Sequence, residues 1–269
     1  MESQSSNYRI AYEPDLVPPP ALMRLEGIDV LEEWYRWAEE WSVLLRVYGG
    51  LAMNSAVLEI GCGLGRTAFA LRYYLPRGSY SGFEICPEKV RFLKERFEPA
   101  HPNFSFIHAD VHNTEYNPAG RSAPGEYRFP FADASFDIVY AASVFTHMLP
   151  EGVERYVGET SRVLRPGGRA VFSFLLLDFY RPGQSRPLGF SRPDLDFPVR
   201  YKAYDADFGA ADAKNLEHMT AYRLRLIERF ARAAGLNLEQ SIPGLWSGSV
   251  EQWIGAQDLV ILRKPKGVP

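Results

Sequence analysis

Short apolar runs alternate along this chain with segments whose apolar residues recur at steps of three and four. From residue 56 onward, each apolar run is brief and is bounded by Gly, Pro or polar residues. Such runs are typical of strands buried on both faces, and the three-and-four repeat is typical of amphipathic helices. The pattern therefore predicts an α/β fold, with a mostly parallel sheet covered by helices on both faces.

The individual elements can be placed from the same pattern. We expect strands at 56–60, 80–85, 104–107, 136–141, 169–177, 236–242 and 257–262. We expect helices at 66–75, 87–97, 150–164 and 217–234, the last of which would place His218 and Tyr222 one turn apart.

The first 50 residues differ from this alternation and are expected to form a leader and a cap helix. Residues 1–28 show no period, and we expect them to pack over a site or to remain mobile. A helical repeat begins at Asp29 and ends at Gly49 and Gly50. Core packing is favoured for Trp34 and Trp41 over an aromatic substrate box.

Residues 51–269 are expected to form the main domain, with irregular insertions at about 112–133 and 178–216. Both insertions are rich in aromatic residues, and prolines exclude a long regular element from the second. Irregular segments of this length in a compact domain are usually functional, so the second insertion is interpreted as a lid.

Composition narrows the class of protein. Hydrophobic residues make up 46% of the chain, and 30 basic residues balance 33 acidic ones. This excludes a disordered chain and any sequence-wide basic field, so no nucleic-acid or membrane partner is expected. No apolar run reaches the length of about 20 residues that spans a bilayer. The polar N-terminus and two cysteines, Cys62 and Cys86, interpreted as free thiols, indicate a cytoplasmic protein.

The most informative segment runs from Val57 to Thr67 and reads VLEIGCGLGRT. Glycines between a strand and a helix allow a ligand to approach the backbone closely. The spacing of Gly61, Gly63 and Gly65 differs from the dinucleotide fingerprint, and Arg66-Thr67 is not the Lys-Ser/Thr pair of a P-loop. A nucleotide without a diphosphate fits this loop better.

Two acids follow at strand ends. Glu84 comes about 20 residues after the glycine loop, where a carboxylate accepts hydrogen bonds from ribose hydroxyls. Asp110 follows the third strand, where it can accept a hydrogen bond from an adenine amino group or act as a turn residue.

These motifs, together with FDIVYAASVFTHM at 136–148 and RVLRPGG at 162–168, occur in the order and spacing of one family. Over residues 55–178 the chain resembles the class I S-adenosylmethionine-dependent methyltransferases. The resemblance implies a Rossmann-like, seven-stranded sheet with the last strand antiparallel. It also implies S-adenosylmethionine as cofactor and S-adenosylhomocysteine as product.

The resemblance further implies cofactor-binding roles along the strand ends. The glycine loop would approach the methionine and ribose, Glu59 would hold the loop or the methionine ammonium, and Glu84 the ribose. The whole implied set is Glu59, Gly61, Cys62, Gly63, Gly65, Arg66, Thr67, Glu84, Ile85, Asp110, Val111, Ala141, Ala142 and Ser143.

Methyl transfer from a sulfonium relies on alignment more than on a base, because positioning can contribute about 7–11 kcal/mol. His147, after the fourth strand, is the first candidate for a base, with a packing role as the alternative. His218 is a weaker candidate, and no metal site is expected from the spacing of acids and histidines.

The sequence thus favours a methyltransferase acting on a small molecule, by O-methylation of a sugar or secondary metabolite. A nicotinamide-dependent oxidoreductase and a non-catalytic protein that binds the cofactor are the alternatives. The glycine spacing and the lack of a Tyr-x-x-x-Lys pair disfavour the oxidoreductase. Homo-oligomerisation is compatible with the sequence.

Overall fold

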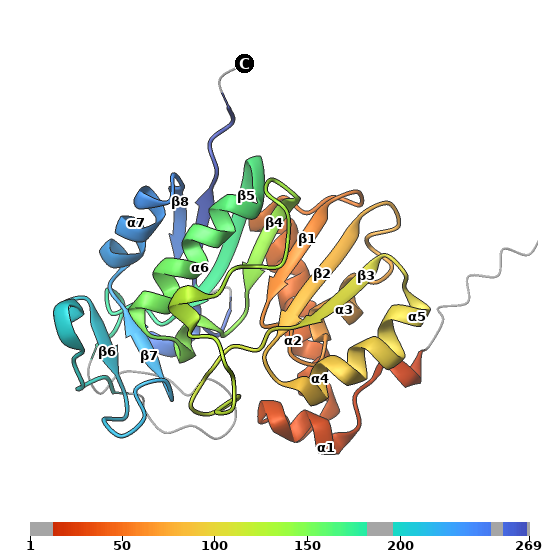
Figure 1. The fold of residues 1–269 in the computed structure, drawn as a ribbon, viewed down its shortest axis with the longest axis horizontal. Coiled ribbons are helices and arrows are strands. Elements are labelled where there is room, and N and C mark those ends of the chain that lie inside the picture. The colour runs from red at the N-terminus through yellow and green to blue at the C-terminus, as the bar shows by residue number, and fades with distance from the viewer. Residues whose placement is uncertain (1–12, 182–195, 249–254, 268–269) are drawn as a thin grey trace, which may run out of the picture.

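The computed structural model describes residues 13–181, 196–248 and 255–267. A seven-stranded sheet in the order β3-β2-β1-β4-β5-β9-β8 forms its centre (Figure 1). The strands are β1 Ala56–Ile60, β2 Ser79–Glu84, β3 Phe104–His108, β4 Phe136–Ala141, β5 Leu164–Phe174, β8 Asn237–Ile242 and β9 Asp258–Arg263. Strands β1 to β5 are parallel, whereas β9 runs antiparallel to both of its neighbours. The expected Rossmann-like sheet with an antiparallel last strand is confirmed.

Helices cover both faces of this sheet, as Figure 1 shows for α6 and α7 on one face and α2 and α3 on the other. The helices are α1 Pro20–Met23, α2 Leu31–Leu44, α3 Arg66–Leu71, α4 Pro87–Phe92, α5 Glu98–Ala100, α6 Pro150–Val163 and α7 Leu224–Ala233. Single π-helical turns extend α2 through Gly49 and α4 through Phe97. None of the helices in the described ranges is long and apolar enough to cross a membrane.

The sheet separates two hydrophobic cores because successive strand residues point to opposite faces. On β1, Val57 belongs to the core beneath α2 and α3, whereas Leu58 belongs to the core beneath α6. Val57 pairs with Ile138 of β4, which faces the same way. Both cores are fully buried, which explains why the central strands read as continuous apolar runs rather than as alternating ones.

The expected helix at 217–234 is wrong in its first part. Helix α7 begins only at Leu224, and β7 Thr220–Tyr222 pairs antiparallel with β6 Phe208–Ala210. Tyr222 also exchanges backbone hydrogen bonds with Leu175 and Leu177 beyond the end of β5. These partners are distant in sequence, and they override the local helical pattern. His218 and Tyr222 therefore do not share a helix face.

Smaller differences affect element boundaries. Helix α3 ends at Leu71 rather than residue 75, and β5 runs from Leu164 to Phe174 rather than from 169 to 177. Within the second expected insertion, 182–195 lie outside the described residues. Its described remainder holds a short 3-10 turn, Lys202–Tyr204, and β6.

The N-terminal residues 13–28, which we call the strap, pack against the α2 face of the sheet. Leu16, Met23 and Ile28 are buried in the same core as α2 and α3. Outside this core, Glu13 accepts hydrogen bonds from Arg72 and Tyr73. Residues 1–12, the remainder of the expected leader, lie outside the described residues.

Strand β9 is held between β5 and β8 by a buried carboxylate at its first residue. The Asp258 side chain accepts hydrogen bonds from the Leu176 amide at 2.7 Å, the Gly244 amide at 2.6 Å and the Trp246 indole at 2.6 Å. One side chain thus ties the end of β5 and the β8–β9 connection to β9.

Replacing this carboxylate should destabilise the fold. Asp258→Ala leaves three buried donors without an acceptor, so we expect the free energy of unfolding to fall by about 3 kcal/mol. Urea unfolding followed by circular dichroism measures this. Asp205→Ala, at an exposed position, is the control. Equal stabilities of the two variants would contradict the assigned role of Asp258.

Candidate functional site

A cavity of about 810 Å³ opens beyond the carboxyl ends of β1, β2 and β4. Strand order reverses at β1 and β4, because the chain runs outward from β1 to β3 and then returns to β4. Ligands of open α/β sheets bind at such a switch point. The volume lies within the range typical of small-molecule sites.

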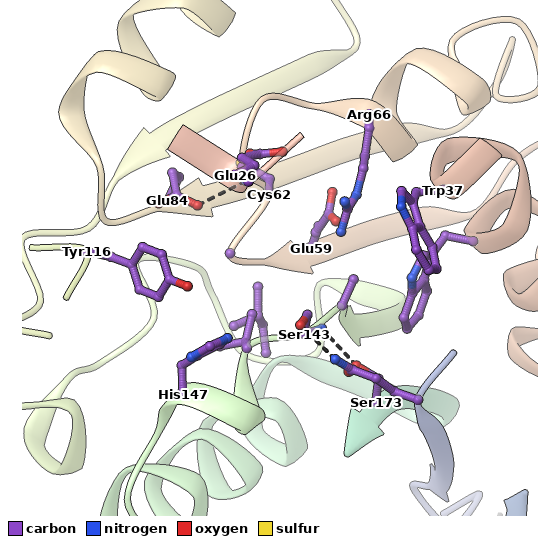
Figure 2. A pocket seen from close by; sticks show the side chains of 18 of the residues that line it. Glu26, Trp37, Glu59, Cys62, Arg66, Glu84, Tyr116, Ser143, His147 and Ser173 are labelled. Atoms are coloured by element: carbon purple, nitrogen blue, oxygen red, sulfur yellow. Dashed lines mark hydrogen bonds between the residues drawn. The ribbon is translucent and has the colours of Figure 1, made fainter. Parts of the chain in front are cut away.

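Two groups of polar side chains occupy different parts of this cavity (Figure 2). Glu26, Cys62 and Glu84 lie together in one region, and Glu59, Arg66 and Trp37 lie together in another. Ser143 and His147 lie across the cavity from the glycine loop.

The glycine loop lies against other chain segments so closely that side chains would not fit. Gly61 has a φ of +66°, and a Cβ there would lie 2.6 Å from Val144 Cγ2. Gly63 has a φ of +53°, and a Cβ there would lie 2.2 Å from a carboxylate oxygen of Glu26. The loop therefore needs glycine both for its left-handed backbone and for these close approaches.

Glu84 fixes the end of β2 to the glycine loop. Its Oε2 accepts a hydrogen bond of 2.9 Å from the Gly63 amide. Its Oε1 accepts bonds of 2.9 Å from the amides of Ile85 and Cys86. The side chain is buried and lines the cavity, so this carboxylate is fixed in position before any ligand binds.

Glu59 is a second buried carboxyl group, on β1. It accepts a hydrogen bond from the Tyr80 hydroxyl. Burial raises its pKa to about 8, although a hydrogen bond from Tyr140 and the charge of Arg66 act in the opposite direction. Glu59 and Arg66 both line the cavity, so the charge on Glu59 can respond to a ligand there.

The end of β4 contributes a strained turn. Ser143 has a φ of +61°, a rare conformation for a residue with a side chain. Its amide donates to Ser173 Oγ at 2.7 Å, and its hydroxyl accepts from Gln257 Nε2 at 2.8 Å. These two bonds hold the turn against the cavity, and Ser173 and Gln257 line it as well. Both were missed by the sequence reasoning because they lie far from Ser143 in sequence, Ser173 on β5 and Gln257 just before β9.

His147 lies in a 3-10 turn after β4 and lines the cavity. Its Nδ1 lies 3.2 Å from the Glu217 carbonyl oxygen, and its ring meets that of Tyr116 edge-on at 5.3 Å. A carbonyl can only accept a hydrogen bond, so Nδ1 carries the proton. In the neutral ring, Nε2 then has the lone pair that a base requires.

His218 is placed elsewhere. It lies on the segment before β7, half exposed, and its Nδ1 lies 3.1 Å from Glu115 Oε2. It does not line the cavity. Helix α7 begins only at Leu224, so His218 does not lie on the helix that the sequence predicted. The reason for expecting His218 to face an acceptor is therefore removed.

The remaining expected residues divide by position. Ile85, Val111, Ala142 and Cys62 line the cavity, whereas Gly65, Thr67, Asp110 and Ala141 do not. The Asp110 carboxylate pairs with the exposed Arg121 side chain. Its role toward adenine stays a prediction.

Helix α2 and the insertion at 112–133 both line the cavity. Helix α2 contributes Trp37 and the buried Trp41, and the insertion at 112–133 contributes His112, Asn113, Tyr116 and Pro124. The described part of 178–216 contributes none. In the described ranges, no three His, Cys, Asp or Glu side chains are grouped as a metal site requires.

A family model described as "Methyltransferase domain" matches residues 57–168, the segment that carries the glycine loop, Glu84 and the β4 turn. Residues 57–168 therefore match a methyltransferase domain. The resemblance to the class I S-adenosylmethionine-dependent methyltransferases is thereby confirmed.

Relatives and solved structures extend the comparison. The phthiotriol/phenolphthiotriol dimycocerosates methyltransferase of Mycobacterium tuberculosis is 25% identical over 213 residues, which are 78% of this chain and 64% of that protein. The chain thus spans less than two thirds of the length of that relative.

Two solved structures share the fold of the methyltransferase domain and its surroundings. One is the 1,6-didemethyltoxoflavin-N1-methyltransferase of Burkholderia thailandensis, with bound 1,6-didemethyltoxoflavin and S-adenosylhomocysteine. It is 17% identical, with a TM-score of 0.50 over 93% of this chain and 92% of that one. The [4+2]-cyclase SpnF is 16% identical, with a TM-score of 0.57 over 94% of each chain. At these identities the similarity shows a shared fold alone.

The raised pKa of Glu59 gives the methyltransferase domain a pH-dependent stability. The folded chain keeps a proton on Glu59 up to about pH 8, whereas the unfolded chain loses it near the ordinary value of 4.5. Stability from this group is therefore full below about pH 4.5 and falls as the pH rises to about 8. We expect wild type to lose on the order of 3 kcal/mol more than Glu59→Gln between pH 5 and pH 8.

Urea unfolding of both proteins at the two pH values measures this difference. The neutral amide is the matched control, because every other titrating group is common to both. Parallel changes with pH in the two proteins would show that Glu59 titrates at its ordinary value in the folded state.

Proposed function

We propose that this chain binds S-adenosylmethionine in the cavity and transfers its methyl group to a small-molecule acceptor. The observation that supports this best is the placement of the glycine loop and Glu84 together at the switch point of a methyltransferase domain. Gly61 and Gly63 give the loop its left-handed backbone beside the cavity, and the loop lacks the spacing that binds a diphosphate. A mononucleoside cofactor fits these residues.

The two polar regions of the cavity suit the two ends of this cofactor. Glu84 would accept from a ribose hydroxyl, with Ile85 and Val111 beside the adenine. Glu59 would face the methionine ammonium, and Arg66 the carboxylate. The amide-fixed turn at Ser143 would then stand beside the reacting centre.

When bound, the cofactor supplies an electrophilic methyl group on a sulfonium. The task of the chain is to hold the acceptor atom in line behind that methyl and to exclude water. We assign to His147 Nε2 the role of accepting the proton that a hydroxyl acceptor loses. The Glu217 carbonyl holds the ring proton on Nδ1, which leaves the lone pair on Nε2.

The cavity favours an acceptor with an apolar body and a hydroxyl group. Leu25 and Val30 line the cavity with 46% and 49% of their surfaces exposed, and Met219 lies within the lining. The Mycobacterium relative is named for phthiotriol and phenolphthiotriol dimycocerosates, and the Burkholderia structure holds 1,6-didemethyltoxoflavin; neither name is that of a free sugar. A secondary metabolite therefore fits better than a free sugar, while O-methylation, a cytoplasmic location and any homo-oligomer stay predictions.

The proposed cofactor can be tested without knowing the acceptor. Wild-type protein should bind S-adenosylhomocysteine at one site per chain in a calorimetric titration. Glu84→Ala should weaken binding by about 1.5–3 kcal/mol, the contribution of hydrogen bonds to a charged group. Glu88→Gln, an exposed acid on α4, is the control and should bind normally.

Thermal unfolding of Glu84→Ala must be measured alongside, because three backbone amides lose their acceptor; Glu84→Gln provides a second variant that keeps one acceptor. Absence of binding by folded wild-type protein would contradict the proposal. Binding of NAD instead would support the oxidoreductase alternative.

His147 can be tested on any hydroxylated acceptor that wild type methylates in a screen for released S-adenosylhomocysteine. His147→Ala should lower the turnover rate about 10²–10⁴-fold, the usual contribution of a positioned base, with cofactor affinity unchanged. His218→Ala should retain the full rate, because its ring faces Glu115. A fully active His147→Ala would leave this histidine a packing role.

A further inference from the structure

The strap brings an acidic side chain into the nucleoside region of the cavity. Its second half, from Arg24 to Ile28, crosses beside the glycine loop, and Glu26 points toward Cys62 and Glu84 (Figure 2). Glu26 Oε1 accepts a hydrogen bond of 2.7 Å from the Leu64 amide. The neighbouring amide, that of Gly63, is the one bound by Glu84. Two carboxylates therefore bind adjacent amides of one loop.

Lys89 of α4 lies with these two carboxylates. Its ammonium is 3.5 Å from Glu26 Oε1, and its side chain is only 8% exposed. Burial lowers the pKa of Lys89, but the negative charges of Glu26 and Glu84 have a larger opposite effect. The pKa of Lys89 therefore lies above its usual value. A cation here offsets the repulsion that two neighbouring carboxylates would otherwise feel.

The hydrogen-bonding capacity of Glu84 is nearly exhausted. An ionised carboxylate offers about four acceptor positions, and backbone amides already occupy three of those on Glu84. A ribose presents two neighbouring hydroxyl donors. Glu84 can accept from one of them, and the other needs a second acceptor nearby.

We propose that Glu26 is this second acceptor, so that the strap forms part of the cofactor site. The inference rests on the proposed function. Glu26 contacts the Leu64 amide and the Lys89 ammonium, and its carboxylate has further acceptor positions. Leu64 follows Gly63, whose amide is bound by Glu84. The cavity measures about 810 Å³ with the strap in place, so the strap is a wall of the site rather than a plug.

This arrangement also explains why Gly63 lacks a side chain. A Cβ at this position would lie 2.2 Å from Glu26 Oε1 and would displace the carboxylate from the Leu64 amide. The hydrophobic contacts of Met23 and Ile28 hold Glu26 in place from both sides along the chain.

The test uses ligands that differ only at the ribose. Full-length wild type and Glu26→Gln are titrated with S-adenosylhomocysteine and with its 2′-deoxy and 3′-deoxy analogues. We expect Glu26→Gln to bind S-adenosylhomocysteine roughly tenfold more weakly than wild type does. We also expect it to bind one of the two deoxy analogues as tightly as S-adenosylhomocysteine, because that analogue lacks the hydroxyl that Glu26 accepts. Asp15→Asn, at an exposed position on the same strap, is the control and should match wild type.

Three results would overturn the inference: unchanged affinity in Glu26→Gln, tighter binding in Glu26→Gln, or equal penalties for both deoxy analogues in the variant and in wild type. Ligand-free thermal unfolding shows whether Glu26→Gln folds normally. If it does not, Glu26→Asp, which keeps the charge and withdraws it by one methylene, replaces it in the same comparison. Failure of wild type to bind S-adenosylhomocysteine would refute the proposed function, whereas normal binding by both proteins refutes only the role of Glu26.

Discussion

The finite number of hydrogen bonds that one carboxylate can accept governs the arrangement of this site. Glu84 accepts from three backbone amides, and in doing so it fixes the end of β2 relative to the glycine loop. Buried amides left unpaired cost more than a typical hydrogen bond contributes, so the loop conformation and the position of Glu84 determine each other. Every other polar group of the cavity is placed relative to this joined pair.

The hydrogen-bond partners of each buried carboxyl group also affect its charge. Glu59 and Glu84 stand at the ends of adjacent strands and are both buried, yet they are stabilised differently. Glu84 is surrounded by amide donors, whereas Glu59 meets tyrosine hydroxyls and has a pKa raised to about 8. One carboxyl group is therefore fixed as an acceptor, and the other can change its charge near neutral pH.

The sequence predicted the features that depend on neighbouring residues and missed those that depend on distant ones. The glycine loop, the central strands and α6 follow from local pattern, and the structure has them where expected. The prediction of a helix at 217–223 was wrong because β7 is defined by pairing with β6 and with the chain beyond β5. Glu26, Ser173 and Gln257 carry no local signal, because only the fold brings them to the cavity. Lys89 carries no local signal either, because its partner Glu26 lies on the strap.

The position of β9 has a consequence for how this chain is assembled during synthesis. Residues 258–263 complete the sheet between β5 and β8, so both of those strands keep open edges until this late segment arrives. Unpaired edges readily accept foreign strands, and pairing between β5 and β9 joins segments some ninety residues apart. In a ribosome-bound intermediate, strands β1 to β4 would therefore already be paired, while β5 and β8 would still lack their partner β9. That interval, rather than the mature protein, is where this fold is most exposed to aggregation and to binding by chaperones.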